Sequence, residues 1–152
     1  MARAKKAINR DSFCRLYSWM AVDLGLSGND LMVYAFIYAY STNEGGKGCY
    51  FGGNEVISRS LGCTTKSVER SVHKLNDMGL IELKQAELEN GLKLNYHRVS
   101  PEALEPLEDL SSSVAEGLKA IRAFSESWED LTKMGGKVKR AHKVRGEAER
   151  LF

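Results

Sequence analysis

Cysteine, proline and long apolar runs are scarce in this chain of 152 residues. The three cysteines, Cys14, Cys49 and Cys63, are widely spaced and form no CxxC pair, so neither a disulfide framework nor a zinc finger is expected. The longest uncharged apolar run, residues 31–40, is far shorter than the roughly 20 residues of a membrane span. No apolar signal region follows the basic N-terminus. We therefore expect a cytoplasmic protein with reduced, mostly buried cysteines and no membrane segment.

Patterns typical of enzymes are also missing. The two glycine-rich stretches that contain a lysine, residues 45–48 and 135–137, lack the spacing of a P-loop. His73, His97 and His142 are scattered, and no group of His, Cys, Asp or Glu has the spacing of metal ligands. There is no GxSxG nucleophile elbow. We therefore expect a protein that is not an enzyme and that has neither a cofactor nor a metal site.

Charge is distributed in blocks along the chain, although the net charge is only +2. Residues 1–100 carry 13 Lys/Arg and 10 Asp/Glu, residues 101–132 carry 2 and 8, and residues 133–152 carry 7 and 2. An acidic segment therefore separates a mildly basic body from a basic tail. Basic arms often bind polyanions, which is one interpretation of the tail. The other is a solvated tail that only keeps the protein soluble.

Apolar spacing predicts four helices in the first half of the chain. Phe13, Leu16, Tyr17 and Met20 recur at the spacing of one helix face. A second helix, about residues 29–40, is apolar all round and is expected at the centre of the core, unless an exposed aromatic flank forms a dimer surface. A short strand-like run at residues 49–51 precedes two further helices, about residues 54–60 and 65–78.

A hairpin and a helical region are expected next. Residues 80–85 and 92–99 alternate apolar and polar side chains, and Asn90-Gly91 between them is a strong hairpin-turn signal. Pro101 suits the first position of a helix, and one or two helices are expected to reach about Met134. Gly135-Gly136 is expected to end this region, and the remaining basic tail is expected to be disordered.

Residues 54–83 have the pattern of a helix-turn-helix. A short helix and a tight turn at Gly62 precede the helix expected at residues 65–78, so that the N-terminal half of the second helix faces outward. At 100° per residue, this helix has an apolar side and an opposite polar side. The apolar side carries Val68, Val72 and Leu75, and the polar side carries Lys66, Arg70 and His73.

The turn at residues 61–64 (LGCT), the helix core at 67–70 (SVER) and the segment at 75–81 (LNDMGLI) resemble winged helix-turn-helix DNA-binding domains. Further matching residues lie upstream: Trp19-Met20, residues 24–28 (LGLSG), Leu31, Tyr34-Ala35, Ile37-Tyr38, Ser41 and Phe51-Gly52-Gly53. With these, residues 13–99 resemble a bacterial and phage family of helix-turn-helix proteins that are often replication initiators or replisome organisers on phages and plasmids.

The resemblance implies a mainly α fold of the α+β class, with a small β-hairpin wing. It divides the chain into a flexible basic arm (1–11), a winged helix-turn-helix domain (12–100), a C-terminal helical extension (101–134) and a basic disordered tail (135–152). The extension contains regularly spaced apolar residues, so it either packs on the core or forms a dimerisation element. These residues are Leu104, Leu107, Leu110, Leu118, Ile121, Phe124 and Trp128.

The resemblance also implies that the helix at residues 65–78 lies in the major groove of double-stranded DNA. Arg70 and Lys66 are the first candidates for base or phosphate contacts, and Glu69 either accepts from a cytosine amino group or pairs with a cation on the same helix. Lys84 and Lys93 flank the wing tip, where they could contact phosphates. The expected DNA-binding residues are Arg59, Thr65, Lys66, Ser67, Glu69, Arg70, His73, Lys74, Lys84 and Lys93.

Three functional alternatives remain open at this point. Replication initiation or organisation follows from the family resemblance. The expected partners are a second copy of the chain, in a homodimer, and a replication or transcription protein. A transcriptional regulator uses the same fold, and fold does not decide between the two. A winged helix can also bind proteins, but Lys66, Arg70 and Lys74 outnumber Glu69 and Asp77 on the exposed face, which favours DNA.

Overall fold

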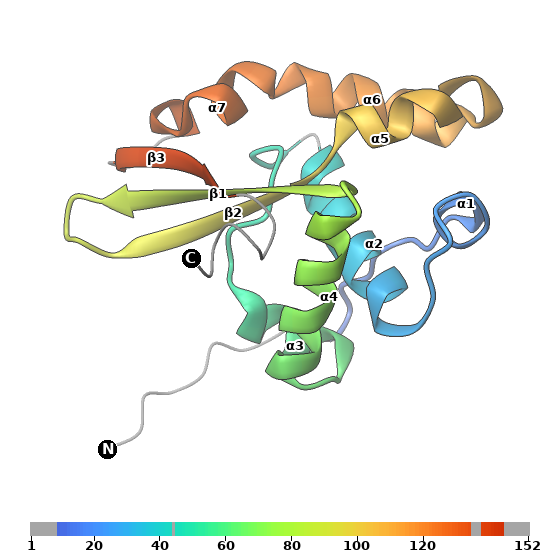
Figure 1. Cartoon of the computed structure of the whole chain (residues 1–152), viewed down its shortest axis with the longest axis horizontal. Helices are drawn as coiled ribbons and strands as arrows, with labels where there is room; N and C mark the ends of the chain where they lie inside the picture. The colour runs from blue at the N-terminus through green and yellow to red at the C-terminus, as the bar shows by residue number, and fades with distance from the viewer. Residues whose placement is uncertain (1–8, 44, 135–137, 145–152) are drawn as a thin grey trace.

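A three-stranded antiparallel sheet lies between two groups of helices in the computed structural model of this chain (Figure 1). The structure describes residues 9–43, 45–134 and 138–144. Most of the expected basic arm, residues 1–8, and residues 135–137 and 145–152 of the expected tail therefore lie outside the described residues. In chain order, the elements are α1 (Ser18–Val22), α2 (Gly28–Thr42), α3 (Asn54–Leu61), α4 (Thr65–Asp77), β1 (Ile81–Leu88), β2 (Lys93–Val99), α5 (Pro101–Leu104), the 3-10 helix η1 (Glu105–Leu110), α6 (Ser112–Ala123), α7 (Ser125–Glu129), the 3-10 helix η2 (Leu131–Met134) and β3 (Val138–Val144).

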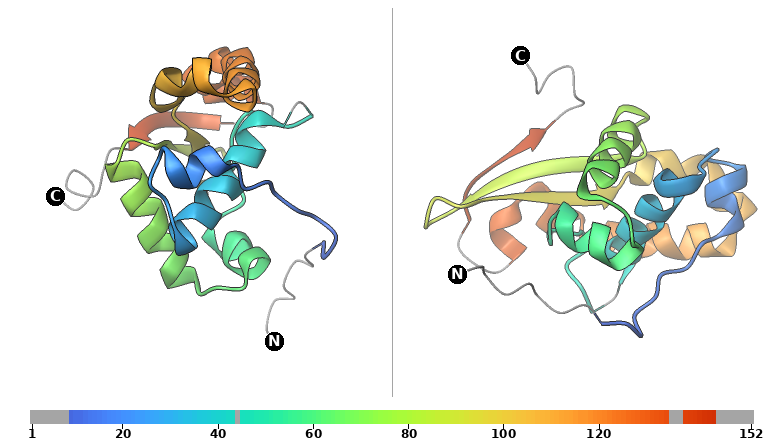
Figure 2. Two further views of the ribbon diagram at one scale, coloured as in Figure 1. Left: turned by 90° about the vertical axis from the view of Figure 1, so that its right-hand side faces the viewer. Right: turned by 90° about the horizontal axis from the view of Figure 1, so that it is seen from below.

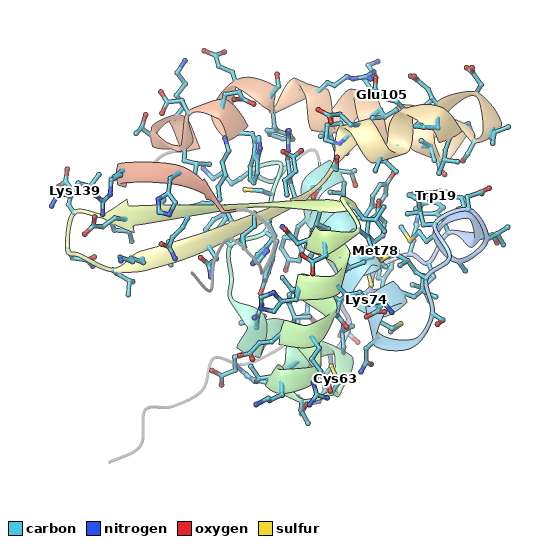
Figure 3. The ribbon with its side chains drawn as sticks, viewed as in Figure 1. Trp19, Cys63, Lys74, Met78, Glu105 and Lys139 are labelled. Carbon is cyan, nitrogen blue, oxygen red and sulfur yellow. The ribbon has the colours of Figure 1, made fainter. Side chains whose placement is uncertain are left out.

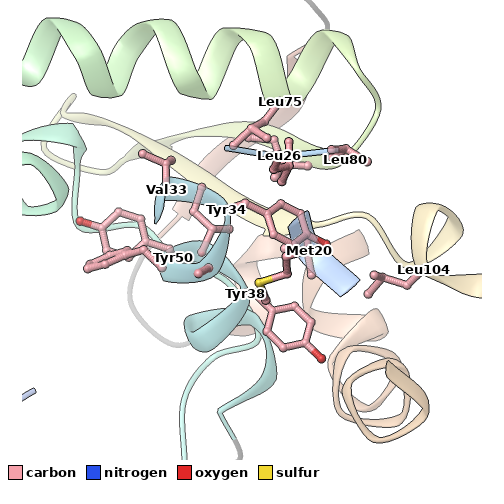
Figure 4. Packing of buried hydrophobic residues seen from close by; sticks show 14 of the residues in the cluster. Met20, Leu26, Val33, Tyr34, Tyr38, Tyr50, Leu75, Leu80 and Leu104 are labelled. Atoms are coloured by element: carbon pink, nitrogen blue, oxygen red, sulfur yellow. The ribbon is translucent and has the colours of Figure 1, made fainter. Parts of the chain in front are cut away.

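Helix α2 is the centre of the main core, as its sequence predicts. Its side chains from Val33 to Tyr38 are all buried, and Tyr40 is the one aromatic side chain of α2 that is substantially exposed, at 44%. Leu75 of α4, Leu80 before β1 and Leu104 of α5 belong to the same buried cluster; Leu75 and Leu80 lie close together, and Leu104 lies apart from them (Figure 4). A helix that is apolar all round must be covered on several sides, and this one is. The core interpretation of α2 is confirmed.

Helices α3 and α4 form the expected helix-turn-helix. Gly62 ends α3 in the left-handed conformation, with φ of +72°, which favours glycine because it has no Cβ. Thr64 then caps α4, since its Oγ1 accepts a hydrogen bond of 3.0 Å from the backbone N–H of Ser67. The start of α4 is therefore fixed by two adjacent local signals that the sequence displays.

Strands β1 and β2 form the expected hairpin wing. Their register runs from the Ile81–Val99 pair at the base to the Glu87–Lys93 pair near the tip. Tyr50 forms an isolated antiparallel bridge to His97 on the other side of β2, which is where the sequence predicts a short strand. Together with the helices, this is a mainly α winged helix-turn-helix with a C-terminal helical extension, so the expected fold class is confirmed.

The C-terminal extension packs on the core of the same chain. Leu104, Val114, Leu118 and Ile121 are buried in the same cluster as the α2 side chains. Gly117 lies inside α6 against α2, and a Cβ at this position would be only 2.0 Å from the hydroxyl oxygen of Tyr38. Of the two alternatives for this segment, the structure therefore shows packing on the core.

Trp128 attaches the end of the extension to the wing. Its ring is buried, and the guanidinium of Arg98 lies 4.8 Å from the ring centre. Arg98 also forms an ion pair of 3.1 Å with Glu82 across the β1–β2 ladder. Cation–π contact and burial of a large aromatic ring both favour this arrangement. Helix α7 thus covers the face of the sheet that is turned away from the main core.

The expectation of a disordered tail is wrong for residues 138–144. These residues form β3, which pairs antiparallel with β1 and gives the sheet order β2-β1-β3. The physical reason is that β1 would otherwise expose an open edge of backbone N–H and C=O groups, which a further strand can pair.

The helix expected around Phe13 and Leu16 is also shorter than the spacing indicates. Helix α1 begins only at Ser18, and Phe13 and Leu16 are 83% and 51% exposed. Short helices depend on packing for their stability, and these two side chains bury little surface. Residues 12–17 therefore lie outside any helix and have no regular secondary structure.

Replacing Trp128 tests whether the extension is part of the cooperative fold. We expect Trp128→Ala to lower the free energy of unfolding by about 3–5 kcal/mol, since a buried ring and its cation contacts are lost. The neighbouring exposed change Glu129→Ala is the matched control and should stay within about 0.5 kcal/mol of wild type. Urea unfolding followed by circular dichroism measures both. An unchanged midpoint for Trp128→Ala would show that α7 does not stabilise the sheet.

Candidate nucleic-acid interface

Helix α4 has a buried face and an exposed face, divided as the sequence predicts. Val68, Ser71, Val72 and Leu75 are buried against the rest of the domain. The exposed side chains include Thr65, Lys66, Glu69, Arg70 and Lys74, whereas Ser67 and His73 are half-buried. The N-terminal half of α4 is thus open to solvent along one side.

Three of these exposed residues have unused polar groups. Lys66, Glu69 and Arg70 form no ion pair or side-chain hydrogen bond with any residue that the structure describes. Of the two alternatives for Glu69, pairing with Lys66 or His73 along the helix is therefore not seen among the described residues. Both cations and the carboxylate remain available for an external partner.

The hydroxyl groups at the start of α4 already take part in its local structure. Thr64 Oγ1 donates to Ser67 Oγ at 2.9 Å, and Thr65 Oγ1 lies 3.3 Å from Ser58 Oγ of α3. These contacts link the turn to both helices of the motif. Ser67 and Thr65 are thus first of all parts of the helix start, with hydroxyl oxygens that can still accept further hydrogen bonds.

Lys74 belongs to a contact that anchors α4 on α2. Its Nζ lies 2.9 Å from Oδ2 of Asp30, and the hydroxyl of Ser71 donates to Oδ1 of the same carboxylate at 2.8 Å. Figure 3 shows Lys74 on the α4 side that is turned toward this part of the chain. Lys74 is therefore a positioning residue as well as a surface cation. Sequence reasoning missed Asp30, which in the sequence is only a polar residue at the start of α2.

Arg59 lies on α3 beside a cavity rather than on the exposed side of α4. The cavity has a volume of about 500 Å³ and is also lined by Tyr40, Tyr50 and Phe51. Arg59 is half-buried and forms no ion pair within the described part of the chain. The structure thus leaves its guanidinium unpaired but does not place it in one row with Lys66 and Arg70.

The structure separates the two lysines expected at the wing. Lys93 is exposed near the tip. Lys84 instead lies 4.9 Å from the ring centre of Trp128, and its ammonium group donates a hydrogen bond to the Trp128 carbonyl oxygen. Strand alternation thus places Lys84 on the sheet face that α7 covers, where its ammonium group contacts Trp128. Nothing in the local sequence around Lys84 indicates that cover.

Strand β3 adds basic residues to the wing that the sequence places in a disordered tail. Lys139, Arg140 and His142 are exposed, and Lys139 lies at the outer end of the sheet (Figure 3). Arg140 Nη2 forms an ion pair of 3.2 Å with Glu87 Oε2. The wing therefore has three strands and an added set of positive charges.

The cysteines show no sign of a reactive site. None of the three forms a disulfide, and burial raises the pKa of Cys49 to about 12, which keeps it protonated at neutral pH. Only Cys49 is buried, whereas Cys14 and Cys63 are half-buried, so the expectation of mostly buried cysteines is correct for one of them. Within the described ranges, no three His, Cys, Asp or Glu side chains gather as metal ligands, and no helix is long and apolar enough to cross a membrane.

Residues 24–81, from the turn before α2 to the first residue of β1, match the model of a protein family described as a helix-turn-helix domain. No curated protein matches the chain. Among solved structures, the chain is similar to a "Possible transcriptional regulator from Methanosarcina mazei Go1", with 19% sequence identity, 76% of this chain and 81% of that chain covered, and a TM-score of 0.42. A likeness this remote carries no argument about function. The family match agrees with the geometry of α3 and α4: the chain contains a helix-turn-helix domain.

Proposed function

We propose that this chain binds duplex DNA by placing α4 in the major groove. The observation that carries the proposal is the exposed side of α4, where Lys66, Glu69 and Arg70 have no partner among the described residues. In a helix-turn-helix, the second helix enters the major groove with its N-terminal residues toward the base edges. Unpaired charged groups at those positions suit such a contact.

The chemistry of each side chain suggests a separate role. Arg70 can donate two parallel hydrogen bonds to O6 and N7 of guanine, and Glu69 can accept one from the amino group of cytosine. Lys66 lies in the first turn, where the free backbone N–H groups of a helix also favour a phosphate. Arg70 and Glu69 would then read sequence, while Lys66 would fix the position of the protein on the backbone.

We further propose replication initiation or organisation on a phage- or plasmid-type element as the process that uses this binding. The support is the residue pattern over residues 13–99, which resembles proteins of that kind. Transcriptional regulation is the alternative, since the same fold serves both. A homodimer and a replication or transcription protein as partner are part of the same proposal.

Selection from a random duplex pool at physiological salt, read by sequencing, tests the proposal. We expect one enriched motif, because Arg70 and Glu69 offer direct base contacts. A twofold-symmetric motif would indicate a homodimer, and its occurrence at replication origins or at promoters would distinguish the two processes. Failure to bind any duplex would contradict the proposal and would favour a winged helix that binds proteins.

Arg70→Ala should weaken binding to the selected motif by about 1–3 kcal/mol, the range for the loss of one base contact. Binding to unrelated duplexes should change much less, because those complexes depend on phosphates. Fluorescence anisotropy with both duplexes measures the difference. Lys119→Ala is the matched control, since Lys119 is an exposed cation on α6, away from α4. Equal affinity of Arg70→Ala and wild type for the motif would show that α4 is docked differently.

A further inference from the structure

We propose that β3 makes the wing a phosphate-binding surface for the duplex that α4 binds, with Arg140 as the principal contact and His142 beside it. This inference rests on the proposed function. It assigns a role to the strand that sequence reasoning takes for a disordered tail. The ligand is the DNA backbone, and the site is the outer half of one sheet face.

The register of the sheet places Arg140 and His142 on that face. Arg140 pairs with Glu87 and His142 with Gln85 in the β1–β3 ladder. Side chains of alternate residues share a face, so these four belong to the same face as Ile81, which is buried in the main core. The base of this face is therefore covered by the domain, whereas Arg140 and His142 are exposed on its outer part.

Strand β3 changes the charge of this outer surface. The hairpin alone offers Glu87 and Lys93 on this face, which cancel, and Lys84 is held on the opposite face by Trp128. Arg140 adds a positive charge and pairs with Glu87 at 3.2 Å, so it also neutralises the carboxylate that would repel phosphates. Strand β3 therefore adds positive charge to this face of the sheet.

The ion pair leaves most of the Arg140 guanidinium open. Its side chain is 67% exposed, whereas that of Glu87 is 21% exposed. A guanidinium has five N–H donors, and the ion pair with Glu87 uses Nη2 alone. Arg140 can therefore keep its contact with Glu87 and still donate to a phosphate. The carboxylate fixes the direction of the guanidinium, which favours binding because less side-chain freedom is lost.

The exposed side of α4 and the outer sheet face that carries Arg140 and His142 lie on the same side of the molecule. In the right view of Figure 2, α4, in green, and β3, in red, lie on one side of β2, and α6 and α7 lie on the other; in the left view, β3 lies between α4 and these two helices. A duplex that receives α4 in its major groove carries its backbone past neighbouring elements on that side, where phosphate contacts fix its orientation. Arg140 and His142 would hold this part of the backbone.

Two variants that break the same ion pair give opposite predictions. We expect Arg140→Gln to weaken binding to the selected motif and to a random duplex by the same factor, roughly threefold to tenfold, because a phosphate contact is independent of sequence. The slope of log K against log salt concentration should fall in magnitude by about 0.9. Glu87→Gln should instead raise the affinity for both duplexes, because it removes a negative charge and leaves the guanidinium free. Anisotropy titrations of the full chain over a range of KCl concentrations measure both quantities.

The comparison separates this inference from a merely structural ion pair. If the pair only held β3 on the wing, both variants would weaken binding alike, and that result would overturn the inference. Unchanged affinity and salt slope for Arg140→Gln would also overturn it, while binding by wild type would leave the proposed function intact. If wild type bound no duplex, the proposed function itself would fail. Lys119→Gln is the control for charge alone and should leave the salt slope unchanged.

Discussion

The fold depends on covering α2, whose side chains from Val33 to Tyr38 are buried on every side. The apolar face of α4 covers one side, the base of the sheet another and α6 a third. Because each of these elements must turn its apolar face toward α2, the opposite face of α4 has to point into solvent. Asp30 helps to fix the orientation of α4 on α2, since its carboxylate binds both Ser71 and Lys74 of α4. The exposed row of Lys66, Glu69 and Arg70 is thus a consequence of how the core is filled.

The C-terminal region supports the wing by packing against it. A two-stranded hairpin alone is only marginally stable in water. This hairpin is supported on one face and along one edge. Trp128 covers one face through Arg98 and Lys84, and β3 pairs with the free edge of β1. The acidic segment is therefore mainly a structural support, and the basic residues that follow it are brought back to the sheet.

Local signals were enough to predict much of this structure. The threonine cap and the glycine turn define α4, and the Asn90-Gly91 pair defines the hairpin, because each acts on its immediate neighbours. The features that sequence reasoning missed all depend on distant partners. The apolar residues of β3 do not alternate along the strand, and β3 needs the edge of β1. The orientation of Lys84 depends on Trp128. Conversely, the helical spacing at Phe13 predicts a longer helix than the structure has, because Phe13 is 83% exposed and buries little surface.

Amide chemical shifts measured by NMR during titration with a duplex report where DNA touches the chain without any substitution. We expect the largest shift changes in the first two turns of α4, with further changes in β3 and little change in α5 and α6. Shifts confined to α5 and α6, or no shifts at all with a duplex pool, would contradict the assignment of α4 as the element that binds DNA.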